Sequence, residues 1–162
     1  GLLLAVALVA ACGGDDGAKV TALTASGAWS RPTPPGATAG VLYLSLTSPT
    51  DDELVGVDVP AAIAASTSLH ETTAAQAGAE MGEMPGMDHG DDALLTMTEL
   101  ATVPLAAQRS VLFEPGGKHI MLQDLAAPLE AGERYEATLR FAHHAPITVE
   151  VVVATSAPDP QR

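Results

Sequence analysis

Thiol groups are almost absent from this sequence, because Cys12 is its only cysteine. Zinc sites often recruit several thiolates, and blue-copper electron carriers need a cysteine thiolate beside two histidines. Cys12 ends an apolar run near the start of the sequence, where we expect it to have another role. A thiolate-based zinc centre and a blue-copper site are therefore both disfavoured.

Positive charge is also scarce. Seven lysines and arginines stand against 20 aspartates and glutamates, which gives a formal net charge of −13 at pH 7. Nucleic acids and anionic lipid surfaces are bound through clusters of basic side chains. We therefore expect no nucleic-acid partner and no polybasic contact with a membrane, and we interpret the acidic surface as a feature that favours solubility.

Signatures of common enzyme classes are missing as well. The sequence has no G-x-S-x-G nucleophile elbow, no phosphate-binding P-loop and no paired-cysteine motif. The His70-Glu71 dipeptide lacks the remainder of a zinc-protease helix motif. The sequence predicts that the protein is not an enzyme.

An apolar segment runs from Leu2 to Cys12. It is too short to span a bilayer as a helix, and it suits the hydrophobic region of an export signal. Val9-Ala10-Ala11-Cys12 resembles a bacterial lipobox, in which the cysteine is lipidated. We expect residues 1–11 to be part of a lipoprotein signal peptide and residues 12–19 to be the lipidated cysteine and a flexible tether. The alternative is a secretory peptide cleaved nearby, with Cys12 unused.

Either reading places the protein outside the cytosol, in the cell envelope or periplasm, and the lipobox adds anchoring to the membrane through the lipid. Thiols in an oxidising compartment tend to form disulfides. Histidine and methionine ligands avoid that reaction.

Strand signals dominate the rest of the sequence. In residues 41–46, for example, Leu42, Leu44 and Leu46 alternate onto one face. The predicted strands are Val20 to Trp29, Val41 to Leu46, Leu54 to Val59, Ala65 to Glu71, Leu94 to Thr98, Ser110 to Phe113, Lys118 to Gln123, Arg134 to Phe141 and Ile147 to Val153. Many short strands separated by turn residues predict an all-β sandwich or barrel over residues 20–154, followed by a flexible tail at 155–162.

Four side chains form a soft, neutral set of candidate metal ligands: His70, Met97, His119 and Met121. Thioether sulfur selects Cu(I) and imidazole tolerates it, whereas Mg²⁺ and Ca²⁺ require oxygen. Alternation along the strand places His119 and Met121 on one face and Ile120 on the other. The sequence therefore predicts a copper site that holds mainly Cu(I).

A second group of possible donors consists of Met81, Met84, Met87 and His89. The glycines and proline between them argue against a stable helix. The group is either a secondary copper-binding arm or an ordinary solvated loop. His143-His144 is placed at a hairpin, where a structural role is favoured over weak Cu(II) binding.

Three sequence blocks resemble the PCuAC family of extracytoplasmic copper chaperones. They are Ala28-Trp29-Ser30-Arg31-Pro32, Ser68-Leu69-His70-Glu71 and Pro115-Gly116-Gly117-Lys118-His119-Ile120-Met121-Leu122. The resemblance implies a cupredoxin-like antiparallel β-sandwich that binds Cu(I) through the four residues above. It also implies delivery of copper to a partner such as a cytochrome c oxidase subunit, often alongside a Sco-type thiol protein.

The spacing after His70 departs from the family pattern. There the first methionine follows the histidine by about ten residues, which is the position of Met81 here. Met97 alone keeps the family's spacing to His119, so we prefer it and interpret residues 74–92 as an inserted Met/His-rich loop. Glu71 stands where the family often has another methionine. The remaining alternatives are copper scavenging, resistance or storage by a lipoprotein, and an Ig-like structural lipoprotein without metal.

Overall fold

The computed structural model describes residues 19–74 and 95–158, and this part of the chain is built from strands. The strands are β1 (Thr24–Ser30), β2 (Ala39–Thr47), β3 (Asp52–Asp58), β4 (Ala64–Ala74), β5 (Leu95–Leu100), β6 (Val103–Leu105), β7 (Ser110–Phe113), β8 (Lys118–Leu125), β9 (Arg134–Phe141) and β10 (Ile147–Val153). The predicted all-β class is confirmed. The described residues contain no helix that is long and apolar enough to cross a membrane.

Several sequence predictions fall on residues outside the described part. They are the signal segment 1–11, the lipidated Cys12 with most of its tether, and the donors Met81, Met84, Met87 and His89 in the inserted loop.

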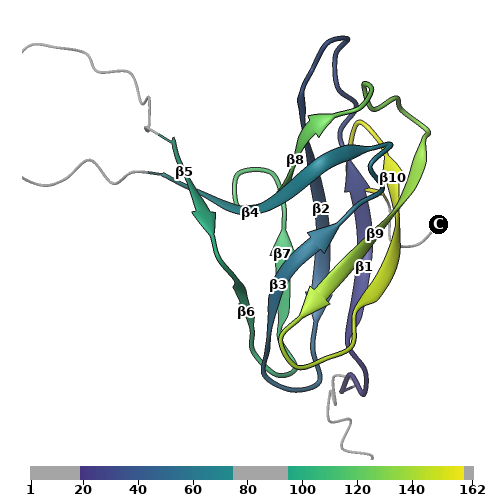
Figure 1. The fold of residues 1–162 in the computed structure, drawn as a ribbon. Helices are drawn as coiled ribbons and strands as arrows, with labels where there is room; N and C mark the ends of the chain where they lie inside the picture. The colour runs from purple at the N-terminus through teal and green to yellow at the C-terminus, as the bar shows by residue number, and fades with distance from the viewer. Residues whose placement is uncertain (1–18, 75–94, 159–162) are drawn as a thin grey trace, which may run out of the picture.

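The strands form one sheet in the order β5-β4-β8-β7-β2-β1-β10-β9-β3-β6, with an additional pairing of β8 to β2. Nearly all pairings are antiparallel; the exceptions are β1 with β10 and β7 with β8. The sheet curls over on itself, so that β3 and β4, which are far apart in this order, come into contact: the Thr67 hydroxyl of β4 donates to the Val57 carbonyl of β3. The ends of β4 and β5 project from one side of the resulting sandwich (Figure 1).

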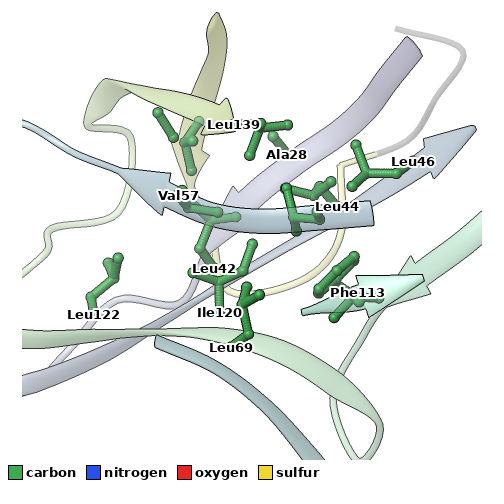
Figure 2. Packing of buried hydrophobic residues seen from close by; sticks show 14 of the residues in the cluster. Ala28, Leu42, Leu44, Leu46, Val57, Leu69, Phe113, Ile120, Leu122 and Leu139 are labelled. Atoms are coloured by element: carbon green, nitrogen blue, oxygen red, sulfur yellow. The ribbon is translucent and has the colours of Figure 1, made fainter. Parts of the chain in front are cut away.

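The core lies between the curled faces of this sheet. The predicted alternation in β2 is confirmed, since Leu42, Leu44 and Leu46 are all buried. Ile120 and Leu122 of β8 pack into the same cluster (Figure 2). Burial of each such side chain contributes roughly 1.5–3 kcal/mol. Because β8 turns these two residues inward, the side chains that alternate with them point away from the core.

A tight turn leads the chain into β8. Gly116 has a φ of 84°, a left-handed conformation that is strained for any residue with a Cβ. The turn is closed by hydrogen bonds from Gly117 N–H to Glu114 O at 3.1 Å and from Glu114 N–H to Lys118 O at 2.8 Å. It fixes where β8 begins, and therefore where His119 sits.

The strand β6 was not predicted, because Pro104 breaks the pattern expected of a strand. The structure accommodates this proline on the last strand of the sheet order, where Pro104 is opposite Glu53. A proline is tolerated there because an edge strand has an outer side on which no N–H is needed for pairing.

Candidate metal centre

His70 and His119 are direct cross-strand partners on β4 and β8. Their ring centroids are 5.7 Å apart and the rings are stacked, with an angle of 24° between their planes. His119 is only 5% exposed, although its side chain is on the face opposite the buried Ile120. The structure thus brings two predicted ligands side by side from segments far apart in the sequence.

The hydrogen bonding of His119 fixes which ring nitrogen is free. Its Nδ1 is 3.1 Å from the Gly117 carbonyl oxygen. A carbonyl can only accept a hydrogen bond, so Nδ1 carries the proton and Nε2 keeps a lone pair. The same carbonyl also accepts the Thr72 N–H at 3.0 Å, which ties the turn to β4.

His70 has the opposite arrangement. Its Nε2 is 2.8 Å from the Ser68 hydroxyl, and its Nδ1 is buried without a hydrogen-bond partner among the described residues. Leaving a buried polar atom unsatisfied costs about 1–3 kcal/mol. A metal ion bound to the Nδ1 lone pair would remove that cost, so the site fits a metal that imidazole can bind.

Met121 and Met97 flank the histidine pair on the same face of the sheet. Met121 is half-buried, two residues after His119, and is opposite Ser68 of β4. Met97 is on the edge strand β5 opposite Thr72, diagonal to His70, and 53% exposed. Diagonal cross-strand neighbours are within reach of long side chains. Met121 is therefore built into the site, whereas Met97 sits at its open edge.

The charged side chains near the histidine pair do not form a hard-metal cage. Glu71 alternates onto the face opposite His70 and forms an ion pair of 2.5 Å with Lys118, directly across from it on β8. Glu99 is an exposed residue opposite His70 on β5. Among the described residues no three His, Cys, Asp or Glu side chains come together as a possible metal-binding group. The nitrogen and sulfur donors are therefore the ones available here.

Comparison with protein families matches residues 23–93 and 86–153 to a family described as "Putative lipoprotein LpqE-like". The chain belongs to the LpqE-like family. "Putative lipoprotein Lxx21020" of Leifsonia xyli subsp. xyli is 33% identical over 138 residues, which cover 85% of this chain and 72% of that protein.

Solved PCuAC domains share the fold of this LpqE-like chain. The apo PCuAC domain from PmoF1 matches with a TM-score of 0.61 and 22% identity, over 87% of this chain and 98% of that domain. The copper-bound PCuAC domain from PmoF2 matches with a TM-score of 0.60 and 23% identity, over 84% of this chain and 93% of that domain. The Cu(I) form of DR1885 from Deinococcus radiodurans matches with a TM-score of 0.58 and 24% identity, over 85% of this chain and 80% of that chain. The predicted PCuAC resemblance and cupredoxin-like sandwich are confirmed.

Two polar residues of the LpqE-like chain near the site were missed from the sequence. Ser68 contacts the His70 ring, and Gln123 Nε2 donates to Ser68 Oγ at 3.0 Å. Alternation along the two strands could have found them, because Ser68 precedes His70 by two residues and Gln123 follows Met121 by two.

His143 and His144 are not part of the metal centre. They follow β9, and their Nδ1 atoms are 3.1 Å and 2.5 Å from the two carboxylate oxygens of Asp52 at the start of β3. Burial opposes the charge on Asp52, but hydrogen bonds from His144, the Glu53 N–H and His143 outweigh it and hold the Asp52 pKa well below its usual range. The contacts agree with the structural role favoured for this pair.

Proposed function

We propose that the protein is an extracytoplasmic copper chaperone that binds Cu(I) through His70, His119, Met121 and Met97. The observation that carries the proposal is the stacked pair His70 and His119, with a buried, unpartnered Nδ1 and a thioether beside it. It is supported by the shared fold of copper-bound PCuAC domains.

The ligand set suits a carrier better than a permanent store. Both kinds of ligand are neutral; soft thioether sulfur favours Cu(I), and imidazole tolerates it. The 53% exposure of Met97 on an edge strand leaves one thioether where an incoming protein can reach it. Transfer would then begin by exchange at Met97 while the less accessible His119 still holds the ion. No catalytic position is required, and the proposal is of a binding protein, not an enzyme.

The cellular setting is part of the same proposal. Lipidation of Cys12 would anchor the protein to the outer side of the membrane and keep it near membrane-bound acceptors. The relative whose name describes a lipoprotein supports this. The proposed recipients are a cytochrome c oxidase subunit or a Sco-type protein, as the family resemblance implies.

A competition titration against a Cu(I) chelator under reducing conditions tests the function. The wild-type protein is expected to bind one Cu(I) tightly, and His70→Ala and His119→Ala are each expected to weaken that binding at least tenfold. His143→Ala removes an exposed histidine outside the site and serves as the matched control. Equal affinities in all four proteins would refute the assignment of the site.

A further inference from the structure

A ladder of polar side chains runs along the same face of β4 and β8 and ends on His70. Ser66 Oγ donates to Gln123 Oε1 at 3.1 Å, and Gln123 Nε2 donates to Ser68 Oγ at 3.0 Å. Ser68 Oγ in turn is 2.8 Å from His70 Nε2. Ser66 is directly opposite Gln123, and Ser68 is opposite Met121, so the sheet register holds the ladder in place.

The direction of these hydrogen bonds bears on the tautomer of His70. A hydroxyl oxygen has two lone pairs, so Ser68 Oγ can accept from Gln123 and from His70 Nε2–H together. Ser68 is half-buried, which leaves its own proton free to point to solvent. The opposite tautomer would place an N–H at Nδ1, where the described residues offer no acceptor. A buried N–H without an acceptor is rarer in proteins than a buried acceptor without a donor, so the Nε2–H tautomer is favoured.

We propose that Ser68, held by Gln123, is a positioning residue that keeps His70 in the Nε2–H tautomer and so makes Nδ1 its copper-binding nitrogen. The Gly117 carbonyl keeps His119 in the Nδ1–H tautomer, so copper would bind that ring through Nε2. The two stacked rings would thus offer opposite nitrogens to one ion. The inference rests on the proposed copper-binding function and deepens it.

Fixing both tautomers before copper arrives raises affinity, because neither ring has to exchange its proton on binding. Groups that hydrogen-bond to the second nitrogen of a metal-bound histidine typically change metal affinity 10–100-fold. Loss of the Ser68 hydroxyl should produce an effect of that size without removing any ligand.

The tautomers can be read in the metal-free protein by long-range ¹H–¹⁵N NMR of labelled histidines. The expected result is Nε2–H for His70 and Nδ1–H for His119. In Ser68→Ala the His70 signals should shift towards a mixture of tautomers, and Ser68→Thr should restore the wild-type pattern. Finding His70 as Nδ1–H in the wild-type protein would overturn the inference.

Cu(I) affinity provides the second readout. Ser68→Ala is expected to weaken binding by about 10–100-fold, Gln123→Leu less so, and Ser68→Thr to restore it. The matched control is Ser110→Ala, which removes a similar cross-strand hydroxyl contact of 2.7 Å to Thr47, on β7 and β2. Wild-type affinity in Ser68→Ala would overturn the positioning role. Absence of Cu(I) binding by the wild-type protein would instead overturn the proposed function. The titration of the wild-type protein alone reveals that outcome, so the two failures can be distinguished.

Discussion

At the scale of single residues, the two thioethers differ in how firmly the fold holds them. Met121 is half-buried on the central strand β8, between partners on β4 and β2. Met97 is on the edge strand β5 and more than half exposed. A fixed donor contributes more to affinity than one that must be ordered on binding, because ordering a flexible side chain costs conformational entropy.

Met121→Ala should therefore weaken Cu(I) binding more than Met97→Ala, and Met97→Ala should leave the melting temperature nearly unchanged. Chelator competition and thermal unfolding measure the two effects. If Met97→Ala bound Cu(I) as tightly as the wild-type protein, Met97 would not be a ligand and Met81 would become the candidate.

The Asp52 carboxylate makes the stability of the fold depend on pH. Its pKa is held below the unfolded value of about 4, so its contribution to stability is complete above that pH and is lost as the pH falls towards the folded-state pKa. Asp52→Asn should lower the free energy of unfolding by about 2 kcal/mol at pH 7.

Urea unfolding at pH 7 and at several values below pH 4 measures this effect. The difference between wild-type protein and Asp52→Asn should shrink as the pH falls, since the wild-type carboxylate loses its advantage. A difference that is the same at every pH would show that the charge on Asp52 does not stabilise the fold.

At the scale of elements, β8 and the turn before it carry most of the site. The turn supplies the Gly117 carbonyl that orients His119, and β8 supplies His119 and Met121. This part was predictable, because alternation within one strand decides which side chains share a face. That His70 and His119 meet was predicted only through the family resemblance. Their direct pairing could not be derived from the strands, because the alternation within each strand does not reveal the register between strands that are distant in sequence.

The turn before β8 contains two neighbouring glycines, so the need for a glycine at Gly116 can be tested with Gly117 as the control. Gly116→Ala places a Cβ on a residue with a φ of 84°, and it should cost about 1–2 kcal/mol of stability although the space around it is open. At Gly117 an added Cβ would meet Glu114 Cγ at an ordinary 3.6 Å, and φ is not positive. Gly117→Ala should therefore be nearly neutral. Chemical denaturation measures the stability of the two variants, and an equal loss of stability in both would contradict this account of the turn.

At the scale of the whole molecule, an acidic sandwich presents the proposed copper site beside the edge strand β5. The sheet curls so that the core is on one face of β4 and β8 and the donors are on the other. Composition and alternation were sufficient to predict the all-β class. The short β6 escaped prediction because only its edge position makes Pro104 acceptable in a strand.

The Met/His-rich segment lies outside the described residues and is predicted from sequence to be a second, weaker copper-binding arm. Deleting Gly78 to Asp91 should leave the first Cu(I) equivalent intact and remove any further equivalents, as measured by titration. Loss of the first equivalent would show that Met81, not Met97, is a primary ligand. A deletion that changes neither stoichiometry nor loading rate would mark the segment as a solvated loop.

The most direct test of the central claim is X-ray absorption at the copper edge of the full protein loaded with one Cu(I) per chain. The proposed site predicts a mixed first shell of imidazole nitrogen and thioether sulfur. Replacing both His70 and His119 by alanine should remove the nitrogen contribution, whereas His143→Ala should leave it unchanged. A shell of sulfur alone in the wild-type protein, or a nitrogen contribution that survives the double substitution, would contradict the account.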